Sequence, residues 1–148
     1  MQFSRNWLKE FLDLNISTGD ICSQLTMAGV EVDGYDSFNS KLTGKDSIIK
    51  LDITPNRGDC FSVYGVAREL AVINNLKLKS LNFRAITGSF KEDIKIKVCK
   101  EAPRYAGRSI KNINLRAKTL PLVAERLTLS DQKLIDPVVD ITNYILLK

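Results

Sequence analysis

The residues with the clearest chemical potential in this sequence are arginines whose positions are fixed by their neighbours. Arg57 stands in residues 52–60, Asp-Ile-Thr-Pro-Asn-Arg-Gly-Asp-Cys, which join a short apolar run to a helix-patterned segment. Pro55 fixes its own φ angle, and Asp59 can cap the following helix through its carboxylate. The turn does not require Arg57. We predict that Arg57 either contacts a partner or is a solvated turn residue.

A second cationic stretch follows Pro103. Arg104, Tyr105 and Arg108 place guanidinium groups and an aromatic ring on one extended segment. Aromatic rings stack on bases and arginines bind phosphate, so this segment is a candidate surface for nucleotide stacking and phosphate contact. The alternative is structural, with Tyr105 buried and the arginines solvated.

Most catalytic and metal chemistry is excluded by the residue types that are missing. The chain has no histidine, no GxGxxG and no GxxxxGK[ST], and its cysteines, Cys22, Cys60 and Cys99, lack CxxC spacing. This argues against histidine triads, phosphate cradles and zinc sites. The cysteines are predicted to be reduced and buried. Asp136 and Asp140, one helical turn apart, are explained by a helix cap and a solvated face. We predict no catalytic residue, no metal ligand and no cofactor bound by this chain.

Composition and charge point to a globular chain whose two halves differ in net charge. The sequence has 148 residues, 44% of them apolar, and a net charge of +5. Residues 1–75 carry 7 Lys and Arg against 10 Asp and Glu, whereas residues 76–148 carry 15 against 7. The basic half predicts a polyanionic neighbour such as RNA, an acidic protein partner, or simply a lysine-rich solvated surface. Without a signal-peptide core or a long apolar run, the chain is predicted to be cytoplasmic with no membrane partner.

The spacing of apolar residues predicts an α+β chain. Ser4 and Ser17 or Thr18 are expected to cap two short helices ending near residues 15 and 29, and residues 61–74 carry the clearest helical stripe. Trp7 and Leu70 are expected in one core. Predicted strands cover residues 30–38, 48–53, 94–98 and 104–110, a loop covers 39–47, and helices begin near residues 119 and 136. The predicted domains are 1–75 and 93–148, joined by a linker at 76–92. The apolar pattern at residues 144–147 predicts that the second domain is incomplete.

Several motifs together resemble a known family. They are Phe3-Ser4 through Trp7-Leu8, residues 26–34 (Thr-Met-Ala-Gly-Val-Glu-Val-Asp-Gly), residues 54–60 followed by Gly65-Val66-Ala67-Arg68-Glu69, residues 102–108, and residues 138–144 (Val-Val-Asp-Ile-Thr-Asn-Tyr). In this order they resemble the N-terminal part of bacterial phenylalanyl-tRNA synthetase (phenylalanine-tRNA ligase) beta chains. The resemblance implies a small winged-helix-like domain followed by the incomplete start of an α/β editing domain.

The resemblance also implies partners and absences. Larger relatives carry an oligonucleotide-binding barrel of roughly a hundred residues where this chain has residues 39–47. Their editing pocket uses a histidine motif that this chain lacks. The implied partners are the alpha subunit, in an α2β2 heterotetramer, and tRNA. The candidate tRNA contacts in this chain are Arg57, Arg104, Tyr105 and Arg108. ATP and magnesium would serve the whole complex, and the isolated chain would be inactive. The rival hypothesis is a stand-alone basic nucleic-acid-binding module without catalytic activity.

Overall fold

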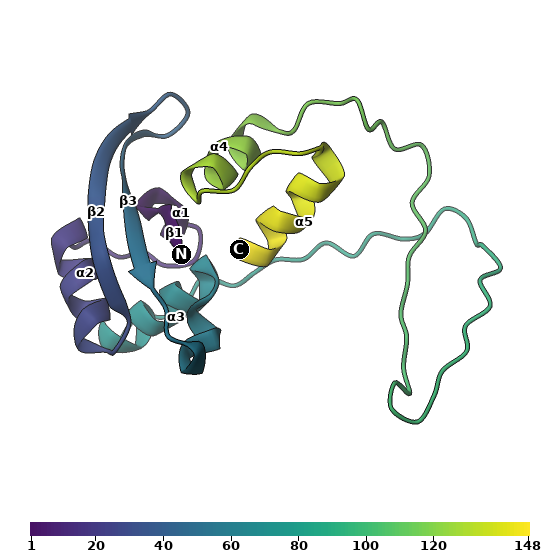
Figure 1. Cartoon of the computed structure of the whole chain (residues 1–148), viewed down its shortest axis with the longest axis horizontal. Helices are drawn as coiled ribbons and strands as arrows, with labels where there is room; N and C mark the ends of the chain where they lie inside the picture. Colours follow the sequence, from purple (N-terminus) through teal and green to yellow (C-terminus); the bar gives the residue numbers. More distant parts are fainter. The chain divides into compact units, whose positions relative to one another are not determined.

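The computed structural model describes residues 1–148, which form a mixed α+β structure (Figure 1). The chain divides into two compact units, residues 1–81 with 115–148, and residues 82–114. The first unit contains every helix and strand. In chain order these are β1 (Gln2–Ser4), α1 (Arg5–Leu8), α2 (Thr18–Met27), β2 (Glu31–Ser40), β3 (Gly44–Asp52), the 3-10 helix η1 (Pro55–Cys60), α3 (Val63–Ile73), α4 (Pro121–Leu129) and α5 (Pro137–Leu147).

The two N-terminal helices begin where their caps were predicted. Ser17 and Asp20 form a capping box, in which the Ser17 hydroxyl accepts from the Asp20 amide and the Asp20 carboxylate accepts from the Ser17 amide. Gly29 follows α2 with a φ of 81°, the left-handed geometry that glycine adopts most readily. Ser4 precedes α1, but its hydroxyl donates to Asp46 instead of capping, and α1 ends at Leu8. The predicted helix over residues 4–15 is therefore shorter than expected.

The long hairpin of β2 and β3 belongs to a three-stranded antiparallel sheet with the strand order β1-β3-β2, in which β3 is the central strand (Figure 1). Phe3 pairs with Ile49 on one side of β3, and Tyr35 pairs with Ile49 on the other. The predicted loop over residues 39–47 is wrong, because pairing continues to Ser40 and resumes at Gly44. Only residues 41–43 turn between the strands, so β2 passes directly into β3 at the place where larger relatives are expected to carry a barrel.

One apolar core joins the sheet to the helices. Trp7 and Leu70, which the sequence placed in a shared core, are both fully buried. The strands contribute alternate residues to this core because strand side chains point to opposite faces. The largest fully buried side chains include Trp7, Phe3, Phe11, Leu12, Ile21, Leu25, Ile49, Leu51 and Leu70.

The C-terminal helices belong to this same unit. Pro121 and Pro137 occupy the first turns of α4 and α5, and the Asp136 carboxylate accepts from the amides of Val138 and Val139, as predicted. Gln2 donates its side-chain amide to the Leu129 carbonyl at 3.0 Å. This grouping differs from the predicted division into 1–75, 76–92 and 93–148. Residues 76–81 also stay with the first unit, since the backbone amide of Lys79 donates to the Phe11 carbonyl at 2.8 Å.

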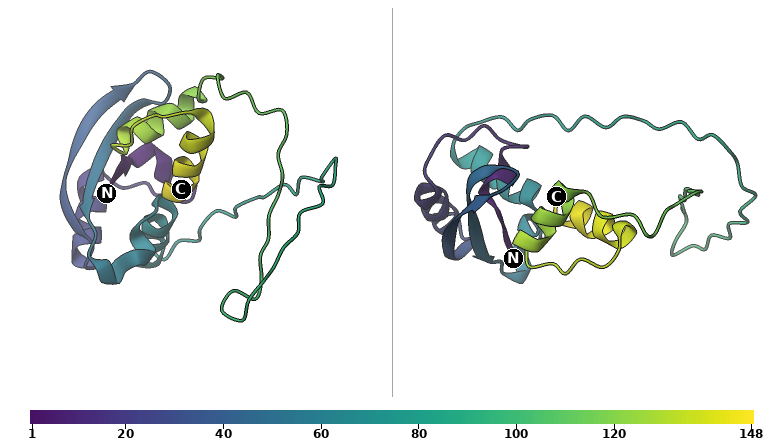
Figure 2. Two further views of the ribbon diagram at one scale, coloured as in Figure 1. Left: turned by 45° about the vertical axis from the view of Figure 1, so that its right-hand side comes forward. Right: turned by 90° about the horizontal axis from the view of Figure 1, so that it is seen from above.

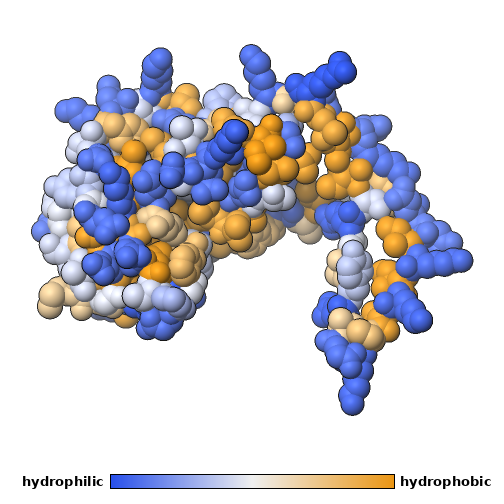
Figure 3. Space-filling model, in the orientation of Figure 1, coloured by the Kyte–Doolittle hydropathy of each residue, from blue (hydrophilic) through white to orange (hydrophobic).

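The outer face of α4 and α5 remains apolar. Tyr144 and Leu147 pack against the core, whereas Ile145 and Leu146 of the same predicted apolar run are exposed. Apolar side chains gather over these helices in the space-filling view (Figure 3). Exposed large apolar residues here are Leu122, Val138, Ile141, Ile145 and Leu146.

Residues 82–114 contain no helix or strand (Figure 2). The predicted strands over residues 94–98 and 104–110 are therefore wrong for this structure. A strand is held by hydrogen bonds to a neighbouring strand, and these segments have no sheet to join. Cys99 is exposed here, contrary to prediction, while Cys60 is buried and Cys22 is partly buried; all three are free thiols.

Candidate functional site

The turn around Arg57 is the 3-10 segment η1 between the sheet and α3, and it is kinked at Arg57, whose φ of −108° and ψ of 41° are not helical. Thr54 precedes η1 in extended geometry, and Pro55 occupies its first turn. The sequence suggested that Asp59 caps α3, and this prediction is wrong. Ser62 is the cap, because its hydroxyl accepts from the Gly65 amide at 3.0 Å. The Asp59 carboxylate is thus left to act elsewhere.

Arg57 binds groups from three parts of the chain. Its guanidinium donates to the Ala28 carbonyl at 3.2 Å, to the Asp59 carboxylate at 3.2 Å and to the Glu69 carboxylate at 2.9 Å. It also lies 3.2 Å from the Cys60 sulfur. These partners come from the end of α2, from η1 and from α3. Arg57 therefore joins the motif at residues 26–34 to both segments of the motif at residues 54–69, a connection that the sequence alone did not reveal.

The electrostatics of this cluster follow from the arginine. The hydrogen bond from Arg57 lowers the pKa of Asp59, and the same bond raises the pKa of Arg57. Burial raises the pKa of the Cys60 thiol, more than the Arg57 charge lowers it. Cys60 is therefore a neutral buried thiol at neutral pH and not a poised nucleophile.

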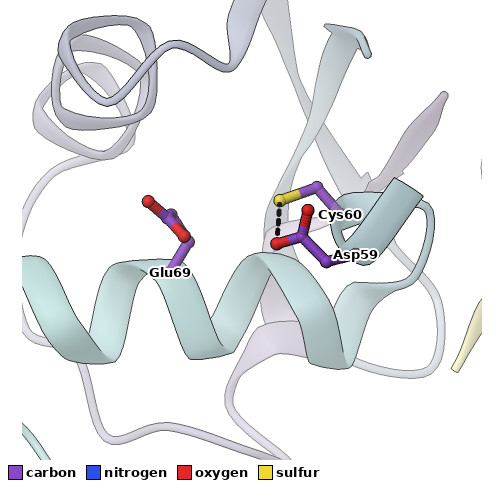
Figure 4. A group of neighbouring side chains, drawn as sticks. All are labelled: Asp59, Cys60 and Glu69. Carbon is purple, nitrogen blue, oxygen red and sulfur yellow. Dashed lines mark hydrogen bonds between the residues drawn. The ribbon is translucent and has the colours of Figure 1, made fainter. Parts of the chain in front are cut away.

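The same cluster resembles a cation site in its ligand atoms. Asp59, Cys60 and Glu69 each offer one atom, and these atoms lie within 4.8 Å of one another (Figure 4). Nη2 of Arg57 contacts all three side chains. The guanidinium thus supplies the positive charge that the carboxylates require, and the cluster is an ion-pair network of the protein itself.

Gly65 permits this packing of α3 on the turn. A Cβ atom at this position would lie 1.8 Å from the Asp59 carbonyl oxygen. Real Cβ atoms never approach so closely, so the backbones would have to separate. Gly65 is therefore required by close approach of the two segments.

A second cluster lies between α1 and the C-terminal helices. The rings of Trp7 and Tyr144 stack with centroids 5.1 Å apart, and the Arg126 guanidinium lies 5.0 Å from the Trp7 ring centroid. Arg126 also donates to the Tyr144 hydroxyl at 2.8 Å and pairs with Glu10 at 2.5 Å. The sequence analysis missed Glu10 and Arg126 as partners. The available signal was Arg126 within the apolar stripe of its helix, since a buried cation needs an acid or aromatic partner.

The other predicted site residues lie in the second unit. Tyr105 is 66% exposed, and Arg104 and Arg108 are exposed too, so the alternative with a buried Tyr105 is wrong. Arg108 lines a hollow of about 710 Å³ together with Phe90 and Lys111. Within that hollow, hydrogen bonds from Ser109 and Lys111 lower the pKa of Glu92. The structure thus keeps Arg104, Tyr105 and Arg108 on one exposed stretch, whereas Arg57 belongs to the other unit.

None of the helices has the length and apolar character needed to span a membrane.

Comparison with known proteins first identifies a domain family. Residues 101–148, which include the Arg104 to Arg108 stretch, α4 and α5, match the family model of the B3/4 domain. The chain is 45% identical over 105 residues to the phenylalanine–tRNA ligase beta subunit of Pseudoalteromonas translucida, covering 70% of this chain and 13% of the relative. It is 38% identical over 151 residues to the beta subunit of Vibrio parahaemolyticus, covering 99% of this chain and 18% of the relative.

These matches confirm the resemblance drawn from the motifs: the chain is a homologue of phenylalanine–tRNA ligase beta subunits. It spans only 13% to 18% of the length of these relatives. A third relative, the beta subunit of Acinetobacter baylyi, is 43% identical over 104 residues, which is 70% of this chain and 13% of that protein.

Proposed function

We propose that this chain contributes the N-terminal scaffold and a tRNA-facing surface of a phenylalanine–tRNA ligase beta subunit, in the attachment of phenylalanine to its tRNA. The observation that carries the proposal is the 38% identity to a beta subunit over 99% of the chain. Its coverage of only 18% of that relative means that catalysis is proposed for the complex and not for this chain.

The scaffold role is supported by how the motif residues are used. Arg57 and Gly65 hold the turn to α2 and α3, and Trp7 stacks on Tyr144. Motif residues that contact one another in this way stabilise the fold, and they can do so without touching a substrate. We further propose that residues 1–75 are winged-helix-like, for which the hairpin of β2 and β3 with α2 and α3 is the supporting feature.

The tRNA-facing role is assigned to Arg104, Tyr105 and Arg108. Their exposed side chains combine charge for phosphate with a ring for stacking. Arg57 as a tRNA contact stays a prediction, and its side chain is only 21% exposed and engaged with Asp59 and Glu69. The basic balance of residues 76–148 favours the same assignment.

The partners proposed by analogy with the relatives are the alpha subunit, in an α2β2 complex, and tRNA, in the cytoplasm. ATP and magnesium would then bind elsewhere in that complex. We propose that this chain alone does not charge tRNA and does not perform editing, because it contains no histidine for the editing motif that its family uses.

Co-expression with a phenylalanine–tRNA ligase alpha subunit tests the proposal. We expect the two chains to co-purify and to remain together in size-exclusion chromatography. Failure to co-purify, combined with tight tRNA binding by the chain alone, would favour the stand-alone nucleic-acid-binding module instead.

A further inference from the structure

The outer edge of β2 is a long strand edge at the border of the sheet. The order β1-β3-β2 leaves β2 paired with β3 on one side only (Figure 1). A bulge interrupts the register between Val32 and Gly34, and pairing then runs without interruption from Tyr35 to Ser40. An edge of this length offers backbone amides and carbonyls to another extended chain.

A hollow runs beside this edge, between β2 and α2. Its volume is about 530 Å³. Met27 and Tyr35 present apolar surface there, with exposures of 88% and 46%. A flexible methionine and an aromatic ring suit contact with alternate side chains of an added strand. The lining residues are Gly19, Cys22, Ser23, Thr26, Met27, Val32, Gly34 and Tyr35.

The charge of the two elements selects the kind of occupant. Glu31, Asp33 and Asp36 lie on β2 and Asp20 lies on α2, and neither element carries a basic residue. Lys50 of β3 pairs with Asp36 at 2.6 Å, so four carboxylates face one lysine and the balance stays negative. A second copy would place these carboxylates against their own kind across a β2–β2 pair, which is unfavourable. RNA would be repelled for the same reason. A basic strand would instead meet opposite charge.

We propose that the β2 edge beside α2 docks an extended, basic segment of a protein partner, which adds to the sheet as a further strand. Main-chain hydrogen bonds along Tyr35–Ser40 would hold the segment. One of its apolar side chains would enter the hollow at Met27 and Tyr35, and its lysines or arginines would face the carboxylates. This inference does not depend on the proposed tRNA role, which uses the other unit.

Titration of the full chain with the fluorescently labelled peptide Lys-Val-Lys-Ile-Lys-Val tests the inference. We expect saturable binding by anisotropy, together with slower amide hydrogen exchange at Tyr35–Ser40. The matched peptide with glutamate at each lysine position should bind at least about tenfold more weakly. Equal binding of both peptides, no binding of either, or unchanged exchange along β2 would overturn the proposal.

Single variants distinguish binding in the hollow from an effect of the overall charge of the chain. Ser23→Lys adds a cation to an exposed helical position in the hollow, and we expect about tenfold weaker peptide binding. Val72→Lys adds the same charge on the exposed face of α3 and should leave binding unchanged. Glu31→Gln removes an exposed carboxylate next to Val32 of the hollow and should weaken binding about threefold at low salt. If Val72→Lys and Ser23→Lys weaken binding equally, or if sedimentation reveals a dimer that buries β2, the proposed site is wrong. Circular dichroism confirms that each variant is folded.

Discussion

The turn at Arg57 and the stretch at residues 104–108 both carry motif arginines, and their surroundings differ. The Arg57 guanidinium contacts Asp59 and Glu69, whereas Arg104 and Arg108 lie on an exposed stretch without helix or strand. The same residue type therefore stabilises the fold in one region and is available to a partner in the other. Motif membership alone does not distinguish these roles, because the distinction is made by the contacts that each arginine forms in the folded chain.

The largest expected difference between the two regions concerns their apolar residues. Trp7 is fully buried in the first unit, so Trp7→Ala should lower the free energy of unfolding by about 3 to 5 kcal/mol in urea denaturation. Ile96 is half exposed in residues 82–114, and Ile96→Ala should change it by less than about 0.5 kcal/mol. Comparable losses of unfolding free energy for the two variants would show that Ile96 is packed in a core, contrary to its exposure in the structure.

A smaller but still large effect is expected at the turn. Gly65→Ala places a methyl group against the Asp59 carbonyl, and overpacking of this kind destabilises by about 1 to 3 kcal/mol or more. Gly107→Ala in the other region meets only the Tyr105 ring, at 3.2 Å, and should be tolerated. Thermal melts of both variants check the contrast. A Gly65→Ala protein as stable as the parent would mean that α3 does not lie close to the turn.

The cap of α2 should contribute less again. Ser17→Ala removes one half of the capping box with Asp20 and should lower stability by about 1 kcal/mol. Ser80→Ala, outside any helix, is the matched control and should have no measurable effect. Urea midpoints at one protein concentration compare the two. An unchanged midpoint for Ser17→Ala would show that the Ser17 cap does not stabilise the first unit.

The pH dependence of the Arg57 cluster has a defined sign. Because Arg57 lowers the pKa of Asp59 in the folded chain, its contribution is present above about pH 4, the ordinary aspartate value, and is lost as pH falls through the folded pKa. Asp59→Asn lacks this contribution. The stability gap between parent and Asp59→Asn should therefore close between pH 5 and pH 2 in urea titrations. A gap that stays constant with pH would exclude an ion-pair role for Asp59.

Local sequence signals predicted the parts of this structure that local chemistry decides. The Ser17 and Asp136 caps, the Gly29 stop and the α3 stripe each depend on residues within a few positions. The α+β class and the buried Trp7 and Leu70 followed from the same patterns.

Long-range contacts were beyond these signals. The Arg57 bond to Ala28 spans 29 residues, and no spacing rule connects them. The segments at residues 94–98 and 104–110 were predicted as strands from their pattern of apolar and polar residues. Such a pattern forms a strand only where a partner strand exists. Asp59 was assigned as the cap of α3, but its carboxylate accepts a hydrogen bond from Arg57, two residues earlier, and the actual cap, Ser62, was not recognised.

The most direct test of the contrast between these two regions is the salt dependence of tRNA binding by the full chain, parent against Arg104→Ala/Arg108→Ala. Each phosphate contact removed should lower the slope of log affinity against log salt by about one unit. We expect the double variant to lose about two units of slope while its unfolding free energy stays unchanged. An unchanged slope and affinity would contradict the assignment of the exposed stretch to tRNA.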